Sequence, residues 1–440
     1  MTAAADFGYT DAVHALHDAL TFGINPSLEP VTAMAEEMGG PQDSFVSIQV
    51  TGTNGKSSVT RIIAALLEAH GVNTGTYTSP ELHSYTERIA CGGVPVSEVM
   101  FAAGVAEALA AAERAGVTPT EFEILTAAAL WLFRECGVEV AVLEVGMGGR
   151  WDATSVVEPA VAVITGVSLD HTAHLGETRE EIAADKAHII KAGSVVVLGP
   201  ATTGVERVLT RHAAGLEPQV TMHAVRHGLQ ASPLGETDTL RYSVTANPQS
   251  PGEPSRVDVS GRAPYTGIEV HGPAYQAANV ATAVAAAEAF LDRKLDAELV
   301  RAAVAATVFP GRFQVLRRDP WLVADAAHNA EAAGVLAKAI GTVWPDPEVR
   351  PVVVLGVLSD KDAAGMVFAL APVVAGFVAV APDSPRALPA EELADVVEHV
   401  TGERPGVAGS VAEGIEMALA ASPVAGSVVT GSIRTVAEAG

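Results

Sequence analysis

The sequence contains little cysteine. Cys91 and Cys136 are the only cysteines among 440 residues, and two thiols provide neither a disulfide framework nor the spacing of a zinc site. This usage fits a protein of the reducing cytoplasm rather than a disulfide-stabilised secreted domain.

Basic residues and long apolar runs are also scarce. Lys and Arg number 27 against 52 Asp and Glu, a formal net charge of −25, whereas a nucleic-acid surface needs clustered cations. No run approaches the ~20 apolar residues of a membrane span, and residues 1–11 lack the basic start and apolar core of a signal peptide. We therefore expect no nucleic-acid or membrane partner, and an anionic ligand must meet a local cation or a metal.

One stretch, I-Q-V-T-G-T-N-G-K-S-S-V-T at 48–60, has the pattern of a phosphate site. An apolar strand pattern breaks at Gly52 and Gly55, whose turn can direct backbone N–H groups at phosphate oxygens. Lys56 adds a charge for the terminal phosphates, Ser57 and Ser58 add hydroxyls for Mg²⁺, and a helix is expected at 61–70, with its positive end toward the anion.

The pattern is not a full Walker A motif, because Val50 stands where the outer glycine would be. An ordinary glycine turn is the alternative. The order of strand, loop and helix favours the phosphate site.

The rest of the chain predicts an α/β protein of two domains. Hydrophobic residues make up 49%, and this length exceeds one ordinary core. We predict a P-loop-containing, parallel-sheet N-terminal ATPase domain at 1–308, with a small irregular, partly antiparallel insertion near 201–262, and a smaller Rossmann-like C-terminal domain at 309–440. The turn at 308–313 marks the boundary because Pro310 and Gly311 stop a helix. The strands are expected at 46–50, 140–145, 160–164, 194–198, 321–324, 351–355, 376–381 and 427–430.

Two polar side chains follow strands of the predicted N-terminal sheet. Glu144 ends A-V-L-E, and His171 follows A-V-I-T-G-V-S-L-D. Carboxyl ends of parallel strands share one edge, where the phosphate loop also lies, so these groups could hold Mg²⁺ with nucleotide phosphates. Taken singly, a carboxylate capping a turn and an ordinary loop histidine remain the alternatives.

Ten segments together resemble the dihydrofolate synthase/folylpolyglutamate synthase family, a branch of the Mur ligase superfamily. They include G-T-N-G-K at 52–56, Y-T-S-P-E-L-H-S-Y-T-E-R-I at 77–89, T-E-F-E-I-L at 120–125, E-V-G-M-G-G-R-W-D-A-T at 144–154, L-D-H-T-A-H-L-G at 169–176 and A-D-A-A-H-N at 324–329. The match runs in order along nearly the whole chain, and the block from 144 to 176 is the most specific.

The resemblance implies a role for each matching residue. The ATP site would comprise Gly52, Thr53, Asn54, Gly55, Lys56, Ser57 and Ser58, with Asn279, Arg312, Asp325 and His328 from the domain junction. The magnesium ligands would be Ser79, Glu144 and His171, and the catalytic residues Lys56, Lys186 and His171. Lys186 matches a lysine that the family carbamylates, although a solvent-facing helical lysine is the ordinary alternative. A pterin would meet Asn25, Pro26, Ser27, Leu28, Thr120, Glu121, Phe122, Glu123, Trp151, Asp152 and Ala153.

Four positions depart from the family. Ser57 replaces a glycine, Glu81 a histidine, Trp151 a leucine and Ala326 a glycine. The first adds a hydroxyl, whereas Glu81 and Trp151 bear on the choice of substrate.

The implied reaction is ATP-dependent joining of a carboxylate to the amine of L-glutamate through an acyl phosphate. ATP is the co-substrate, Mg²⁺ the cofactor, and dihydropteroate or a reduced folate the acid; we expect a monomer. A murein-type ligase is one alternative, although a uridine-binding domain should then precede the loop and only about fifty residues do. A nucleotide-switched binding protein is the other.

Overall fold

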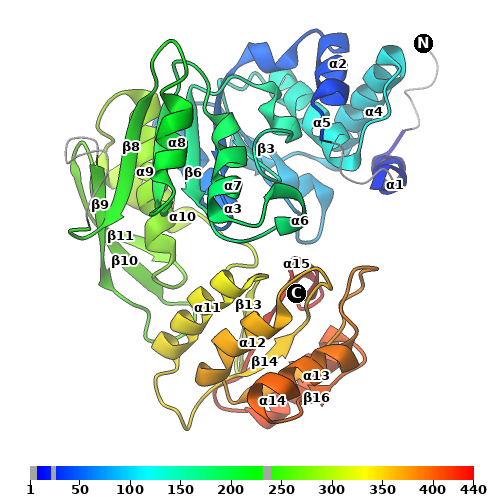
Figure 1. The fold of residues 1–440 in the computed structure, drawn as a ribbon, viewed down its shortest axis with the longest axis vertical. Helices are drawn as coiled ribbons and strands as arrows, with labels where there is room; N and C mark the ends of the chain where they lie inside the picture. Colours follow the sequence, from blue (N-terminus) through cyan, green and yellow to red (C-terminus); the bar gives the residue numbers. More distant parts are fainter. Residues whose placement is uncertain (1–6, 21–25, 231–238) are drawn as a thin grey trace. The chain divides into compact units, whose positions relative to one another are not determined.

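The computed structural model describes residues 7–20, 26–230 and 239–440. They form two compact units, shown in Figure 1. The first takes the chain up to Ser243 together with Asp258–Ile268 and Ala278–Ala306; the second takes Val244–Val257, Glu269–Ala277 and Thr307–Gly440. The sequence prediction divided the chain after residue 308 and did not anticipate the two shorter segments of the second unit.

The larger sheet is a long, mainly parallel one. In the described chain it has eleven strands in the order β11-β10-β9-β8-β7-β6-β1-β5-β2-β3-β4. The pairs from β9 through β2 are parallel, and β3 and β4 are added antiparallel. The strands are β1 (Val46–Thr51), β2 (Thr74–Tyr77), β3 (Ile89–Cys91), β4 (Val94–Pro95), β5 (Val140–Glu144), β6 (Val161–Gly166), β7 (Val195–Ala201), β8 (Thr221–His227), β9 (Thr239–Ala246), β10 (Pro254–Ser260) and β11 (Pro264–His271).

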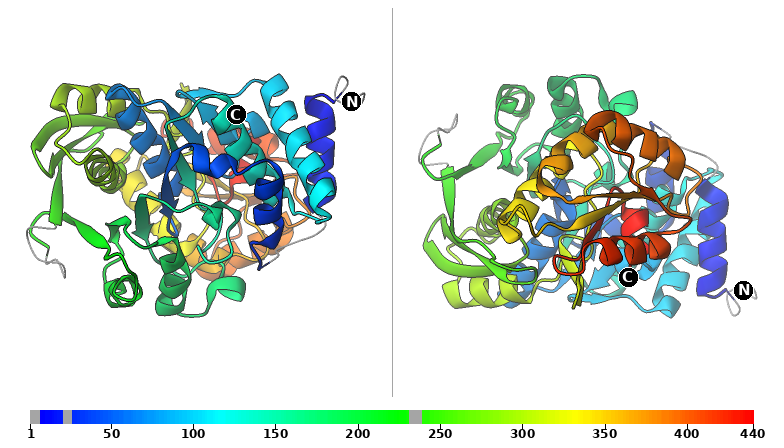
Figure 2. Two further views of the ribbon diagram at one scale, coloured as in Figure 1. Left: turned by 90° about the horizontal axis from the view of Figure 1, so that it is seen from above. Right: turned by 90° about the horizontal axis from the view of Figure 1, so that it is seen from below.

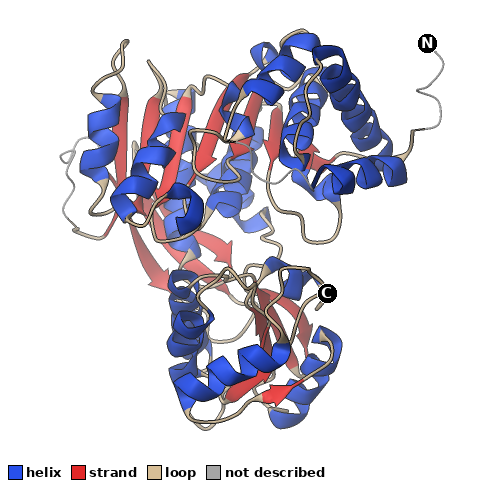
Figure 3. Cartoon of the chain, turned by 45° about the vertical axis from the view of Figure 1, so that its right-hand side comes forward, coloured by secondary structure: helices blue, strands red, loops and turns tan. Residues whose placement is uncertain are grey.

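Helices alternate with these strands, as Figure 3 shows, which confirms the α/β class. They are α1 (Tyr9–Ala19), α2 (Glu29–Glu37), α3 (Lys56–Ala69), α4 (Glu98–Ala115), α5 (Glu121–Glu135), α6 (Thr172–Leu175), α7 (Arg179–Lys186), α8 (Glu206–Ala213), α9 (Gln276–Leu291) and α10 (Ala297–Ala306), with short 3₁₀ turns η2 (Pro41–Ser44), η3 (Tyr85–Arg88), η4 (Ala153–Val156) and η5 (Ala187–Ile189).

One face of the central strands packs against two groups of helices. Ala141 and Leu143 of β5 share an apolar core with α1, α2, α4 and α5, and Ile164 of β6 shares another with α7 and α8. The register places Gln49 of β1 on this same face. Gln49 is fully buried and its amide donates to Thr154 and Ser155 hydroxyls at 2.9 and 3.1 Å, so β1 anchors the turn that follows Trp151.

The segment predicted as a small irregular insertion is instead part of this sheet. Residues 201–262 contain α8 and strands β8 to β10, and β8 pairs parallel with both β7 and β9. The prediction failed because these strands are partly exposed: β9 and β10 alternate between covered and exposed residues rather than forming apolar runs. Such strands give a weak hydrophobic signal in sequence.

The second unit has its own sheet. Its order in the described residues is β12-β13-β17-β14-β15-β16, parallel except for the β12–β13 pair. The elements are β12 (Gln314–Arg318), β13 (Trp321–Asp325), α11 (Ala330–Val343), β14 (Val352–Leu355), α12 (Ala363–Leu370), η6 (Ala371–Val373), β15 (Gly376–Ala379), α13 (Ala390–Thr401), β16 (Gly406–Val407), α14 (Val411–Ala421), β17 (Ser427–Thr430) and α15 (Ile433–Ala437). Helices cover both faces (Figure 2): α11, α12 and α13 share one core and α14 another.

None of the helices in the described part of the chain combines the length and apolar character that crossing a membrane requires.

Candidate active site

The loop between β1 and α3 is held in place by the end of β6. Gly52 has φ 154°, and a Cβ there would lie 1.9 Å from Thr165 Oγ1, so a larger residue does not fit. The Thr165 hydroxyl donates to the Asn54 carbonyl at 2.6 Å. The Thr53 hydroxyl donates to the Ser168 carbonyl at 3.2 Å and accepts the Ser168 N–H at 3.0 Å. These contacts hold the loop against the end of β6 and the residues that follow it.

Lys56 is the first residue of α3 and bends over this loop. Its ammonium donates to the Gly52 and Thr53 carbonyls at 3.2 and 3.3 Å. Asn279 on α9 packs from the other side, because a Cβ at Gly55 would lie 2.5 Å from the Asn279 amide oxygen. A helix N-terminus with Ser57 and Ser58 in its first turn and a lysine above the loop form a site for an anion.

Glu144 lies at the end of β5 beside the first turn of α3. Its side chain is buried; Oε1 accepts the Ser57 hydroxyl at 2.9 Å and Oε2 accepts the Ser79 N–H at 3.1 Å. The structure thus brings Ser57, Ser79 and Glu144 together, a set of hard oxygen groups that fits a divalent cation.

His171 begins the short helix α6. It is exposed, with a left-handed backbone at φ 51°, and its N–H donates to the Asp170 carboxylate at 2.9 Å. Within the described residues, no group of three or more His, Cys, Asp or Glu side chains is arranged to hold a metal. The role of His171 as a metal ligand or catalytic residue stays a prediction.

We expect Glu144→Ala to raise the divalent-cation concentration needed for half-maximal activity at least about tenfold, because a buried oxygen ligand is lost. The measurement is a metal titration of ligase activity at saturating ATP. Glu139→Ala provides the control, since this exposed carboxylate precedes the other end of the same strand. An unchanged titration for Glu144→Ala would remove Glu144 from the metal site.

Lys186 ends α7 and is buried rather than solvent-facing. It is 3% exposed, and its Nζ donates to the Gly52 carbonyl at 3.0 Å. Burial, with the nearby Lys56 charge as the second cause, lowers the pKa of Lys186 from 10.5 to about 7. The helix begins with a capping box, in which the Thr178 hydroxyl accepts the Glu181 N–H. The ordinary alternative of an exposed lysine is therefore wrong.

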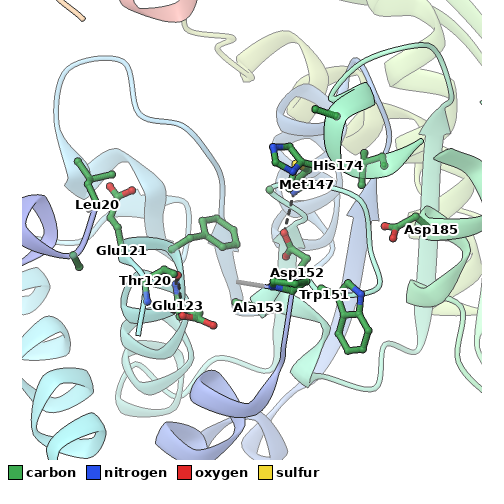
Figure 4. A pocket seen from close by; sticks show the side chains of 16 residues that line it. Leu20, Thr120, Glu121, Glu123, Met147, Trp151, Asp152, Ala153, His174 and Asp185 are labelled. Atoms are coloured by element: carbon green, nitrogen blue, oxygen red, sulfur yellow. Dashed lines mark hydrogen bonds between the residues drawn. The ribbon is translucent and has the colours of Figure 1, made fainter. Parts of the chain in front are cut away.

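A pocket of about 600 Å³ lies in the first unit, and Figure 4 shows side chains that line it. One wall comes from the start of α5, and the other from the turn after β5 together with α6 and α7. The lining residues are Ala19, Leu20, Pro26, Thr120, Glu121, Phe122, Glu123, Gly146, Met147, Trp151, Asp152, Ala153, Ala173, His174, Leu175 and Asp185.

Most residues predicted to contact the pterin line this pocket. The segment Thr120–Glu123 and the turn Trp151–Ala153 do so, and so does Pro26. Ser27 and Leu28 are not among the lining residues. The Ser27 hydroxyl accepts the Glu29 N–H at 3.0 Å, and Leu28 packs on the core. Asn25 lies outside the described residues.

Several polar groups of the pocket also have structural partners. Thr120 and Glu123 form a capping box at the start of α5, with the Thr120 hydroxyl donating to Glu123 Oε2 at 2.9 Å. Asp152 accepts the Met147 and Thr154 N–H groups at 2.9 and 3.0 Å, and burial raises the pKa of its carboxyl. Capping explains Thr120 and Glu123 without a ligand, and their role toward substrate stays a prediction.

Comparison with known proteins decides the family. The Mur ligase middle domain matches residues 50–199, and the Mur ligase glutamate ligase domain matches residues 311–433. Over 455 residues the chain is 36% identical to the dihydrofolate synthase/folylpolyglutamate synthase of Mycobacterium tuberculosis, covering 94% of this chain and 90% of that protein.

The chain belongs to the dihydrofolate synthase/folylpolyglutamate synthase family.

Solved structures agree with this assignment. The folylpolyglutamate synthase of Mycobacterium tuberculosis, complexed with ADP and AMPPCP, superimposes with a TM-score of 0.86 at 34% identity and 98% coverage of both chains. Escherichia coli FolC, in complex with DHPP and ADP, gives a TM-score of 0.85 at 30% identity over 99% of this chain and 97% of that one. This chain is an ATP-dependent ligase, the activity of its family.

The remaining ATP-site residues predicted for this ligase lie in the second unit. Asp325 at the end of β13 accepts the Tyr275 hydroxyl at 2.8 Å and the Phe313 N–H at 2.9 Å. Burial raises the pKa of its carboxyl, and the charge of Arg312 opposes that rise. His328 Nδ1 lies 3.0 Å from the Ala326 carbonyl. The contribution of these three residues to ATP binding stays a prediction.

Sequence reasoning missed some residues that shape this ligase's site. The Asp185 carboxylate accepts the Gly149 N–H at 2.9 Å and lines the pocket, and the Thr51 hydroxyl donates to the Gly148 carbonyl at 2.6 Å. Met147 and His174 also line the pocket. Asp185, Met147 and His174 lie inside or beside the segments that carry the family resemblance, so that resemblance was the available signal.

Proposed function

We propose that this enzyme adds L-glutamate to a pterin-bearing carboxylate, either dihydropteroate or a reduced folate, with ATP bound on the loop from Gly52 to Ser58. One observation supports this arrangement above the others. At the end of α7, Asp185 lines the pocket, and its neighbour Lys186 donates to the Gly52 carbonyl. Consecutive residues of α7 thus contact the pocket and the phosphate loop, which supports the proposal that a carboxylate carried by a ligand of the pocket reaches a bound nucleotide.

The chemistry then follows from where the charges lie. The carboxylate attacks the γ-phosphate, the bond to ADP breaks, and an acyl phosphate forms. The glutamate amine attacks the acyl carbon, and inorganic phosphate leaves from the tetrahedral intermediate. Lys56, at the N-terminus of α3, neutralises phosphate charge during the transfer. Closing the site against water would protect the acyl phosphate from hydrolysis.

Mg²⁺ is the proposed metal, held by Ser79, Glu144 and His171, with Ser57 beside them. The buried Glu144 carboxylate between Ser57 and Ser79 supports this assignment. When bound, the ion would offset the negative charge of the ATP phosphates.

Lys186 is proposed to be carbamylated in the active enzyme. Its amine reacts with CO₂, forming an N–C bond and releasing one proton, and this reaction needs the neutral amine. A pKa near 7 supplies that form at neutral pH, whereas an ordinary lysine with a pKa of 10.5 does not.

The substrate assignment is tested by ADP release over a panel of dihydropteroate, reduced folates, a uridine-linked muramyl acid and several amino acids. We expect release that requires both a pterin carboxylate and L-glutamate. ADP release with the muramyl acid and with none of the pterin acids would replace the pterin assignment by a murein-type one. ADP release that needs neither an acid nor an amine would indicate a nucleotide switch.

A further inference from the structure

A buried arginine links the pocket to the loop that carries Ser79. The loop is closed at its base by the Thr78 N–H, which donates to the Arg88 carbonyl at 2.8 Å. Glu87 accepts the Leu82 and His83 N–H groups at 2.9 and 3.1 Å, so the loop is tied internally as well. The guanidinium of Arg88 is thus held in a fixed frame, 6% exposed.

Two carboxylates compete for this guanidinium. Arg88 Nε and Nη2 each lie 2.5 Å from Glu81 Oε2, whereas Nη2 lies 3.6 Å from Glu121 Oε1. The first distance is a charge-assisted hydrogen bond and the second is too long for one. Glu81 is 8% exposed, so the buried guanidinium is paired with a carboxylate that is itself buried.

Glu121 keeps accepting capacity toward the pocket as a result. Its Oε1 accepts the Tyr85 hydroxyl at 2.7 Å, and Tyr85 also lies under the guanidinium, 5.2 Å from ring centre to Arg88 Cζ. Among the described residues, Glu121 Oε2 has no hydrogen-bond partner, although Glu121 lines the pocket and its side chain is 15% exposed. Figure 4 shows the Glu121 carboxylate on the α5 side of the pocket.

We propose that Glu81 is a specificity-determining positioning residue: by holding Arg88, it leaves the Glu121 carboxylate available to accept a hydrogen bond from an N–H or amino group of the substrate's heterocycle. This inference rests on the proposed function, since it concerns the acid that the pocket holds. A carboxylate hydrogen-bonded directly to Arg88 would be a weaker acceptor for that group than Glu121, which lies 3.6 Å from Arg88 Nη2.

The test is steady-state kinetics of Glu81→Gln, Glu121→Gln and the double variant, with dihydropteroate as the varied substrate. Glutamine keeps the size of the side chain but removes its charge. In Glu81→Gln, the Arg88 guanidinium should therefore form its hydrogen bond with Glu121 instead. We expect each single variant to raise the KM for the pterin acid about tenfold, the loss typical of a hydrogen bond to a charged group. The effect on kcat should stay within about twofold, because the phosphoryl-transfer groups are untouched.

The double variant distinguishes positioning from independent action. Once Glu121 has lost its charge, the inference expects Glu81→Gln to add little to KM, so that the two effects are far from additive. If the effects of Glu81→Gln and Glu121→Gln on KM add in the double variant, the positioning role of Glu81 is wrong. An unchanged KM in Glu81→Gln would also contradict it. Glu81→His, which restores the family residue, should also raise KM and serves if Glu81→Gln folds poorly.

Glu206→Gln is the matched control for loss of a buried ion pair. Arg226 is 1% exposed, its Nη2 lies 2.8 Å from Glu206 Oε1, and neither residue lines the pocket. We expect this variant to lower the melting temperature as Glu81→Gln does and to leave the KM for dihydropteroate unchanged. A raised KM in Glu206→Gln would show that the kinetic effect reports general destabilisation.

The wild-type enzyme separates the two hypotheses. Absence of ADP release with every pterin acid would contradict the proposed function before any variant is made. Normal wild-type turnover with additive KM effects would contradict only the role of Glu81.

Discussion

Replacing Lys56 with alanine is expected to lower ATP-dependent ligation by roughly 10³-fold, the scale of loss for a charged group that stabilises phosphoryl transfer. The fold should persist, because Gly52, Thr53 and Asn54 are held by backbone and hydroxyl contacts to β6 and its following residues. The measurement is ADP release at saturating substrates, accompanied by circular dichroism and a melting curve.

The control for this experiment is Lys338→Ala, which removes an exposed lysine of α11 and should keep wild-type turnover. Near wild-type activity in Lys56→Ala would contradict the phosphate-loop assignment. Loss of activity together with loss of the folded spectrum would instead show that the Lys56 contacts to the Gly52 and Thr53 carbonyls are structural.

The second large effect concerns Lys186. We expect Lys186→Ala to lose about 10²- to 10³-fold of activity, the range for removal of a preorganised charged group, and to regain part of it with millimolar acetate. A short carboxylate can occupy the space of the missing carbamate. Mass spectrometry of the active wild-type enzyme under CO₂ should show the carbamate, and Lys191→Ala is the matched control on the residues that follow the same helix.

The pKa of Lys186 sets the pH dependence. Because folding lowers this pKa from 10.5 to about 7, the unfolded chain binds more protons than the folded one between those values. The contribution of Lys186 to stability therefore rises with pH across this window and no longer changes below pH 7. Carbamate formation should likewise weaken as pH falls below 7. An unmodified Lys186 in a fully active preparation would contradict the proposal.

Local chemistry made much of the fold predictable. The strands β1, β5, β6 and β7 are short apolar runs bounded by Gly, Asp or Pro, and the sequence predicted each with slightly different ends. Parallel strands buried on both faces have this pattern. The strands that follow β7 are partly exposed, and there the same rule gave only a small irregular, partly antiparallel insertion. The success and the failure have one cause, which is how much of a strand is covered.

The burial of Lys186 and the ion pair of Glu81 could not be predicted from sequence patterns. A helical lysine is usually exposed, and only the approach of α7 to Gly52 buries this one. Glu81 was identified from sequence as a departure from the family near the substrate. Its pairing with Arg88 depends on the path of the loop between them and on α5, which brings Glu121 beside the guanidinium.

The sequence by itself determined the strand, loop and helix order from β1 to α3, the α/β class and the family, since each depends on short-range spacing or on an ordered set of motifs. Only the tertiary structure decided which side chains meet in the site. Glu144 lies between Ser57 and Ser79, and Lys186 donates to Gly52, because parallel pairing brings the carboxyl ends of β1, β5 and β6 to one edge. These contacts join residues far apart in the chain, and the pKa of a buried group depends on all the neighbours that such packing provides.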